Sequence, residues 1–431
     1  MNNKILNKLS LSHLILTIFI ISIYLIGFKF KEYVPGGSPE DFTAFIWDNI
    51  KSFQNDFKNS LVNYNKMADA NFPGFYIISS LNPFAYSVET FHLFSLSLGF
   101  LTFILFGIIL SKKDNSNGYL INFSIASLIL ILPFFLTRAY WGTSAGLAWF
   151  IFIILLFYFN KILDLFNNGV KISIINIFIL CFLSSLLLYT RASYIFFILY
   201  ILLYFLLIIK NKKIIFNTFL IFFIFSLPGF YFLFVLINHP GENINAINFI
   251  KFKNIFLNFP VLSSYFTFYL FPLLIIGIKY FNKDIFAHYF KIFFIVFVLY
   301  LILFTMGKLQ YLANYEYGGG AILKLNYILI EENYFILLFS SIIGCCLLYS
   351  FLKKNFLENA ALLLPIFLIY GLTDFPFQDY FEPLIIFLFF SGMFRSSLYD
   401  VFIKNKEATF YLYFFYFFFF LFCSVYFKNF Y

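Results

Sequence analysis

The chain has 431 residues, of which 62% are hydrophobic, 25% aromatic and 11% charged, and its formal net charge is +9. Soluble domains contain about 45–50% apolar residues, divided among short amphipathic segments. This chain instead groups its apolar residues in uninterrupted runs of about 17–24 residues, the length that crosses ~30 Å of hydrocarbon as a helix. Because backbone amides in hydrocarbon have to bond within their own segment, the composition excludes a soluble protein and predicts an all-α polytopic membrane protein.

We predict thirteen transmembrane helices. Their approximate ranges are 9–28, 90–110, 119–136, 141–159, 173–190, 193–209, 214–237, 261–278, 290–307, 333–352, 357–372, 383–399 and 409–427. The first range is too long for the core of a signal peptide, so we expect it to remain as a signal anchor. Together the helices predict a single integral membrane domain over residues 1–431, with no soluble C-terminal domain.

Lysine and arginine collect in alternate connecting segments. With the N-terminus inside, the seven inside segments hold 17 basic and 6 acidic residues, and the outside segments hold 12 basic and 14 acidic ones. Such a bias is typical of cytoplasmic loops. It predicts a cytoplasmic N-terminus, and it explains the positive net charge without any nucleic-acid partner. The long outer segments are then 29–89, 238–260, 308–332 and 373–382.

The first external loop, 29–89, concentrates carboxylates in a chain that has few. They are Glu32, Glu40, Asp41, Asp48, Asp56, Asp69 and Glu89. An apolar face follows at three- and four-residue spacing, made of Phe42, Phe45, Ile46, Ile50, Phe53 and Phe57. This pattern predicts an amphipathic helix on the membrane surface. Glu40 and Asp41 fall in its first turn, where the helix dipole favours negative charge. The pair either only begins the helix or supplies a catalytic base within reach of an acceptor hydroxyl.

Two further polar positions lie later in this loop. Asp69 and Asn71 precede Pro73, which is expected to start a second short helix. We expect both residues to help bind a substrate; for Asp69 the alternatives are to position a metal, to cap a helix or to hold a turn.

Two arginines mark the outer turns of predicted helical hairpins. Arg138 and Arg191 each stand at an outer helix end beside aromatic residues. A leaving phosphate needs a cation, and these are the best-placed arginines for it. The alternative is that each only flanks its helix and extends its charge to the interface.

The later outer segments add weaker candidates. The segment "NYEYGGGAILKL" lacks the features of a phosphate-binding glycine loop, so it predicts a flexible loop. Lys324 in this segment is a separate candidate for a phosphate ligand. "TDFPFQDYFEP" carries Asp379 and two other carboxylates at an outer helix boundary. Asp379 is expected either to line the substrate site or to cap the last helices.

Neither the cysteines nor the histidines predict a metal centre. Cys181, Cys345, Cys346 and Cys423 fall inside predicted spans, and none has metal-ligand spacing to a histidine. No cofactor is assigned with certainty, and a divalent cation stays open.

The order of these features resembles the GT-C superfamily of membrane glycosyltransferases. Members such as the protein mannosyltransferases and the lipid A aminoarabinose transferases often read Asp-Glu in the first loop and His-Pro-Pro-Leu-Tyr-Tyr at a second site. Here the acidic pair is reversed as Glu40-Asp41, and the second site reads "NFPGFY", without histidine. The segments "RAYWGTSAGLAWF", "YTRASYIFF" and "QDYFEPLIIFLFF" are similar to later family segments, although the last departs from an expected Arg-Tyr-x-x-Pro form.

The resemblance implies a polyprenyl-phosphate-linked sugar donor and an aspartate in the first loop as base. That role is carried onto Asp41, with Glu40 as the alternate. The expected partners are the lipid-linked donor, a glycan, lipid or protein acceptor, and membrane lipid, with no nucleic acid. The expected location is a bacterial inner membrane with the active site on the periplasmic face, where nucleotide sugars are absent.

Two other functions stay open. An O-antigen polymerase or ligase usually places its large outer loop late in the chain, whereas here the large loop comes first. A lipid-linked sugar flippase or transporter is expected to carry ionisable residues near mid-membrane, and the predicted span centres are almost free of charge.

Overall fold

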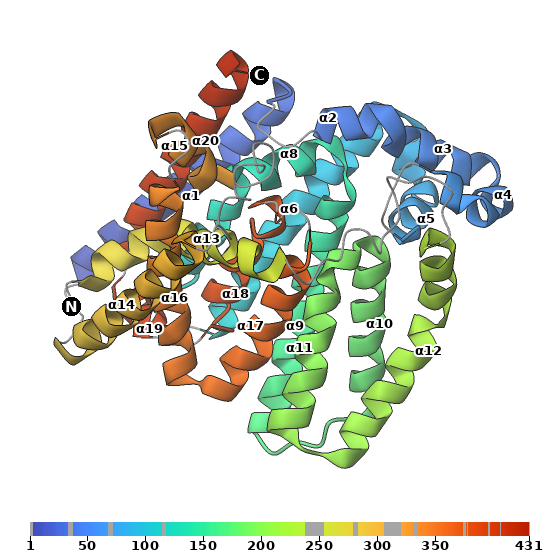
Figure 1. Ribbon diagram of the computed structural model, residues 1–431. Coiled ribbons are helices and arrows are strands. Elements are labelled where there is room, and N and C mark those ends of the chain that lie inside the picture. Colours follow the sequence, from blue (N-terminus) through green and yellow to red (C-terminus); the bar gives the residue numbers. More distant parts are fainter. Residues whose placement is uncertain are drawn as a thin grey trace. The chain divides into compact units, whose positions relative to one another are not determined.

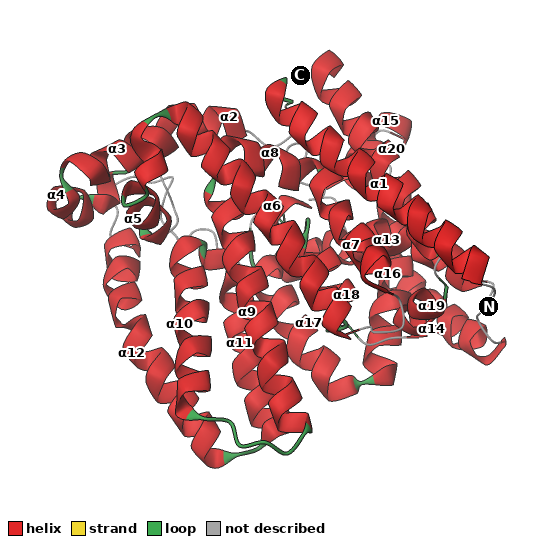
Figure 2. Ribbon diagram, turned by 180° about the vertical axis from the view of Figure 1, so that it is seen from behind, coloured by secondary structure: helices red, strands yellow, loops and turns green. Residues whose placement is uncertain are grey.

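The computed structural model describes residues 3–32, 38–67, 72–113, 118–237, 254–278, 283–305, 320–330, 334–373, 376, 378–394, 397–405 and 407–430. Within these ranges the secondary structure is helical and contains no strand (Figure 2). Contacts divide the chain into two compact units. Unit 1 comprises Met1–Asn248 with Tyr416–Tyr431, and unit 2 comprises Phe249–Phe415.

Unit 1 begins with a long helix, continues through a series of short helices and then forms a set of longer ones (Figure 1). Its elements are α1 (Asn3–Lys29), α2 (Ser38–Asp41), the π-helix η1 (Phe42–Ile46), α3 (Trp47–Asn55), α4 (Phe57–Val62), η2 (Tyr64–Lys66), α5 (Gly74–Ser80), η3 (Pro83–Tyr86), α6 (Val88–Lys113), α7 (Gly118–Ser127), η4 (Leu128–Ile131), α8 (Pro133–Trp141), α9 (Ser144–Asn167), α10 (Ile174–Thr190), η5 (Ala192–Tyr194), α11 (Ile195–Tyr204), the π-helix η6 (Phe205–Ile209), α12 (Lys212–Ile237) and the end of α20 (Ala408–Phe430).

Unit 2 is built around α13, which packs against α16 and α17. Its elements are α13 (Asn254–Ile278), α14 (Lys283–Thr305), α15 (Gly320–Ile330), α16 (Phe335–Lys354), α17 (Phe356–Gly371), η9 (Gln378–Tyr380), α18 (Leu384–Phe390), α19 (Ser397–Lys404) and the start of α20.

The described residues contain eight helices that are long and apolar enough to cross a membrane, and a bent pair would make a ninth. The eight are Leu11–Lys29, Val88–Lys113, Ser144–Asn167, Ala192–Ile209, Lys212–Phe232, Asn254–Gly277, Phe335–Lys354 and Ala408–Tyr426. Shorter apolar helices cover Ile174–Thr190, Phe290–Leu303, Gly320–Ile330 and Phe356–Gly371. The chain is therefore an all-α, multi-pass membrane protein, as predicted, while the number thirteen stays a prediction.

The predicted span 119–136 is not one straight helix. Gly118–Ile131 and Pro133–Trp141 meet at an angle of 72°. Pro133 starts α8, and Leu132 before it is extended, with φ −68° and ψ 125°. The proline ring disfavours helical geometry in the preceding residue, so α8 turns away from α7. Arg138 therefore lies in a separate short helix, α8, and not at the end of a long span.

The predicted span 383–399 is wrong as a single helix. α18 has seven residues, all buried, and ends at Phe390. Gly392 follows with φ +74°, a left-handed conformation that suits glycine. At 1.5 Å per residue, seven residues reach only ~10 Å, which is too short to cross a bilayer. The chain resumes as α19, where Asp400 forms an ion pair with Lys354 at the end of α16.

The short helices of the first loop lie across one end of the longer helices of unit 1. Figures 1 and 2 both show α3, α4 and α5 crosswise over the ends of α10 and α12. The Tyr64 ring meets Phe232 of α12 at 6.2 Å between centroids, which fastens this layer to the bundle. These short helices form a layer that caps one end of the unit, and their place on a membrane surface stays a prediction.

Tyrosines join α1, α6 and α8 at that end. The Tyr140 hydroxyl donates to the carbonyl of Tyr24 at 2.5 Å, and the Tyr24 hydroxyl donates to the carbonyl of Leu96 at 3.1 Å. Gly27 permits this approach, since a Cβ there would lie 2.6 Å from the Tyr140 hydroxyl. Close contact through glycine is typical of membrane helix packing, and here it holds α8 in place.

Candidate functional site

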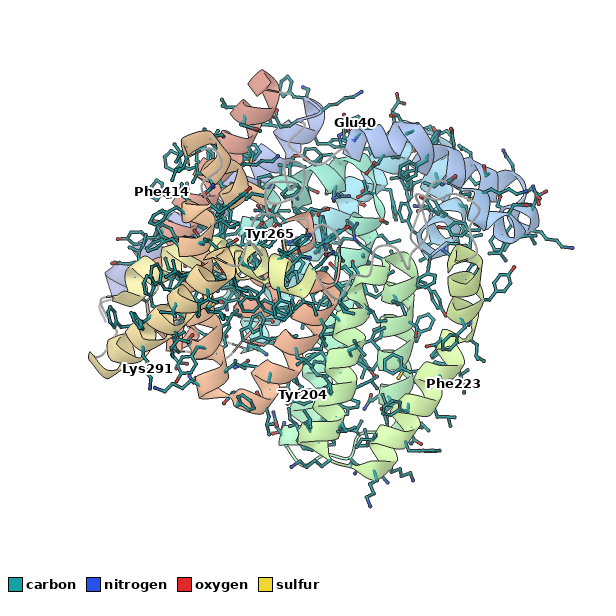
Figure 3. The ribbon with its side chains drawn as sticks, viewed as in Figure 1. Glu40, Tyr204, Phe223, Tyr265, Lys291 and Phe414 are labelled. Carbon is teal, nitrogen blue, oxygen red and sulfur yellow. The ribbon has the colours of Figure 1, made fainter. Side chains whose placement is uncertain are left out.

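The acidic pair lies at the capped end of unit 1. Glu40 is exposed and Asp41 is half-buried in α2, and Figure 3 places Glu40 on this short helix at the same end as the crosswise layer. α2 continues through η1 into α3, and α2 contacts α8. The acidic pair therefore starts a helix that also packs on α8. The contact brings α2, which carries the pair, next to the helix that carries Arg138.

The amphipathic helix after the pair has the predicted apolar face. Its buried side chains are Phe42, Ile46, Ile50 and Phe53. Phe57 is 43% exposed, because Asp56 ends α3 with φ −147° and caps α4 by accepting a bond from the amide of Asn59 at 3.0 Å. The four buried side chains pack on protein and are not left open for contact with lipid. Phe53 stacks with Tyr76 at 6.3 Å between ring centroids, so the face is covered by protein.

An aromatic cluster joins the acidic helix to α6 and α8. Phe42, the residue after Asp41, lies with its ring centroid 4.6 Å from His92 of α6 and 6.3 Å from Trp141 of α8. His92 and Trp141 are 5.2 Å apart. These three ring contacts hold the start of η1, directly after Asp41, against α6 and α8.

Arg138 stands in the last turn of α8 and is half-buried. The helix ends at Gly142, whose φ of +63° no β-substituted residue adopts easily. A Cβ on Gly142 would also lie 2.6 Å from the Phe91 ring. The carbonyl of Arg138 accepts from the amide of Thr143 at 3.5 Å, which closes the turn into α9. The predicted outer turn is thus a tight junction between two helices.

Arg191 occupies the turn between α10 and η5. Its backbone is extended, with φ −153° and ψ 110°, and its side chain is half-buried. The start of α5 packs on the same turn: a Cβ on Gly74 would lie 2.6 Å from the Tyr189 carbonyl oxygen, and the Phe72 ring lies 5.9 Å from the Tyr189 ring. The segments "NFPGFY" and "YTRASYIFF", which are distant in sequence, therefore meet.

Asp69 and Asn71 lie outside the described residues. The helix predicted after them is confirmed, because α5 begins at Gly74 with Pro73 as its N-cap residue.

The two remaining predicted residues belong to unit 2. Lys324 was expected in a flexible loop but lies inside α15, which begins at Gly320. Asp379 lies in η9 and is 6% exposed. α15 and η9 contact each other, so Lys324 and Asp379 belong to neighbouring elements. Four predicted residues thus gather at one end of unit 1, and two lie in unit 2.

A polar chain in unit 2 links these elements to α13. The Gln378 side-chain carbonyl accepts from the amide of Ala321 at 2.5 Å, and its amide nitrogen donates to the Tyr269 hydroxyl at 2.7 Å. Tyr269 donates in turn to Glu382 Oε2 at 2.6 Å. Glu382 is fully buried and Tyr269 lies near the middle of α13. The acidic segment expected at an outer boundary therefore reaches into the unit.

One face of α13 holds this segment along its length. Asn254 and Asn258 donate to the carbonyl of Thr373 at 3.2 and 2.7 Å, and Tyr265 donates to the carbonyl of Pro376 at 2.6 Å. With Tyr269 they form a ladder at helical spacing. Non-helical backbone is tolerated at membrane depth only where protein or water satisfies it, and this ladder supplies the bonds.

Sequence reasoning missed His92 and Tyr189 as members of these clusters, and it placed Glu382 only among the carboxylates at an outer helix boundary. Each is defined by contacts with residues far away in the chain, and no local spacing marks it. The only available signals are the polar residue types themselves within apolar surroundings.

Among the described residues, no three His, Cys, Asp or Glu side chains are grouped so that they could hold a metal ion. Comparison with models of protein families and with curated protein sequences finds no match.

Proposed function

We propose that the protein is a glycosyltransferase that moves a sugar from a polyprenyl-phosphate donor to an acceptor hydroxyl. In this proposal the chain crosses a bacterial inner membrane several times, with a cytoplasmic N-terminus and a periplasmic active site. The observation that carries the proposal is the contact of α2, which bears Glu40 and Asp41, with α8, which bears Arg138. The resemblance to GT-C glycosyltransferases supports the same function.

In the proposed reaction the carboxylates and the arginines have different roles. A carboxylate of the pair takes the proton of the acceptor hydroxyl, and the oxygen forms a bond to the anomeric carbon. The bond from that carbon to the phosphate oxygen breaks, and its electron pair stays on the lipid phosphate. Arg138 or Arg191 stabilises the charge on this leaving group.

Replacing the base tests this function directly. Membranes that contain the protein are supplied with radiolabelled polyprenyl-phosphate sugars, and transfer to acceptor is measured for the wild type, Asp41→Asn and Glu40→Gln. General base catalysis contributes about 10²–10⁴-fold, so we expect one of these variants to lose at least ~100-fold in rate.

Asp48→Asn is the matched control, because Asp48 is an exposed carboxylate on the continuation of the same helix. We expect it to retain wild-type transfer. Unchanged transfer in both Asp41→Asn and Glu40→Gln would remove the catalytic assignment, and no transfer by the wild type with any donor would remove the class.

One observation favours a flippase as second candidate. Glu382 is a fully buried carboxylate bonded to Tyr269 near the middle of α13, and ionisable groups at membrane depth are common in transport pathways. The same assay separates the two functions, because a flippase would move the lipid-linked sugar across the membrane without transferring it.

A further inference from the structure

The start of α9 lacks the usual side-chain cap. Thr143 occupies the N-cap position with φ −84° and ψ 165°, but its side chain accepts no bond from the first amides of the helix. The side chain is 3% exposed, and Oγ1 has no hydrogen-bond partner within the described residues. A buried polar group without a partner costs ~1–3 kcal/mol. A ligand that bonds to this hydroxyl would remove that cost.

The amides at the same helix end are also available. The first amides of any helix lack intrahelical acceptors, and no backbone carbonyl or side chain of the described residues accepts from Ser144 or Ala145. α9 has 24 residues, and a helix of this length presents roughly half a positive charge at its N-terminus. Such an end favours an anion.

His92 provides a second unpartnered group beside this turn. Its Nε2 is buried and has no hydrogen-bond partner within the described residues. The ring lies 5.2 Å from that of Trp141, two residues before Thr143. A neutral imidazole can donate or accept through this nitrogen. Two polar atoms without partners, His92 Nε2 and Thr143 Oγ1, thus belong to elements that meet at Trp141, and Arg138 stands in the helix that leads into the Thr143 turn.

We infer that Thr143, His92 and the first amides of α9 bind a phosphate oxygen of a polyprenyl phosphate. The anionic character of the ligand follows from the helix end and from Arg138, whereas its lipid carrier rests on the proposed function. Thr143 and His92 donate to the phosphate oxygens, and Arg138 balances their charge. The carboxylates on α2 are left to contact the acceptor.

The test measures binding of a polyprenyl phosphate without sugar to the purified protein in nanodiscs. Thr143→Val and His92→Phe are compared with the wild type. Hydrogen bonds to charged groups contribute enough that we expect each variant to bind about tenfold more weakly. Thr143→Val removes a buried unpaired hydroxyl without changing shape, so the melting temperature of the free protein should stay level or rise.

Thr102→Val is the matched control. Thr102 is also fully buried in unit 1, but its hydroxyl donates to the carbonyl of Leu98 within its own helix at 2.8 Å. This variant should keep the wild-type affinity. Loss of binding in Thr102→Val as well would assign the effect to general packing and overturn the inference.

Other outcomes separate this inference from the proposed function. Binding that is equal in the wild type and both site variants overturns it, as does displacement of the polyprenyl phosphate by an equal concentration of phosphatidylglycerol or inorganic phosphate. Weaker binding in both variants supports it. If that weaker binding is found in a protein that transfers no sugar from any donor, the phosphate site stands and the glycosyltransferase function fails.

Discussion

Single residues set how closely the first loop approaches the arginine turns. Gly74 lets α5 pack on the backbone of Tyr189, two residues before Arg191. No pattern in the sequence distinguishes this glycine from others, because the surface it meets is more than a hundred residues away. The acidic pair was different: its place in a first helical turn followed from local capping and spacing, and the structure confirms that place. Its chemical role is not decided by position alone.

Gly74→Ala should destabilise the protein. The new Cβ would lie 2.6 Å from the Tyr189 carbonyl oxygen, which belongs to backbone that cannot rotate away. Overpacking of this kind costs ~1–3 kcal/mol, so we expect a lower melting temperature in detergent. Gly371→Ala is the control, since its nearest neighbouring atom is 3.6 Å away. Equal melting temperatures for the two variants would contradict the close approach.

Helices were predictable where their signals are local. α10 begins after Ser173, whose side chain accepts from the amide of Asn176 at 3.3 Å, and ends before Arg191, as the range 173–190 requires. The length of α18 was not predictable, because an uninterrupted run of apolar residues predicts a full transmembrane helix even where the helix ends within the run. The helix ends before Gly392, whose φ is +74°, and a hydropathy pattern does not show that conformation.

α12 contains a proline that its neighbour compensates. Pro228 cannot donate to the preceding turn. The Tyr189 hydroxyl donates to the carbonyl of Phe225 at 2.5 Å and accepts from the amide of Gly229 at 2.9 Å. In an unbroken helix the amide of Gly229 would donate to the carbonyl of Phe225. The Tyr189 hydroxyl therefore replaces the hydrogen bond that is missing at the proline. Proline in membrane helices is tolerated when such partners are present.

A double-mutant cycle tests this coupling. Tyr189→Phe should cost ~1–3 kcal/mol in the wild type, because it leaves two part-buried backbone groups without the hydroxyl. In a Pro228→Ala background the helix can close its own bond, and the same change should cost less. The free energy of unfolding in mixed micelles measures both steps. An equal cost in the two backgrounds would mean that the hydroxyl does not serve the proline break.

At the scale of the whole molecule, charge bias and packing agree within each unit. The first loop and the Arg138 and Arg191 turns, all predicted outside, gather at one end of unit 1. In unit 2, Lys354 and Asp400, both predicted inside, form an ion pair. The number of crossings could not be fixed by hydropathy, because bent and interrupted segments have the same composition as straight spans.

Cysteine labelling in intact cells tests the orientation. In a background without native cysteines, Tyr86→Cys and Lys353→Cys introduce one thiol each at exposed positions. A membrane-impermeant maleimide should react with the cysteine at position 86 in intact cells, because it belongs to the first external loop. The cysteine at position 353 should react only after permeabilisation. The opposite pattern would reverse the proposed topology.

The ladder on α13 also imposes an order on biosynthesis. Asn258 and its acceptor Thr373 are 115 residues apart, and at ~5–20 residues per second the ribosome needs about 6–23 s to cover that distance. Throughout this interval the polar face of α13 has emerged and its partners do not yet exist. A translocon or insertase that shelters the face until α17 has passed would prevent its amides and hydroxyls from meeting lipid. The bonds between α13 and the segment after α17 can therefore form only late in synthesis, although α13 is the first helix of unit 2.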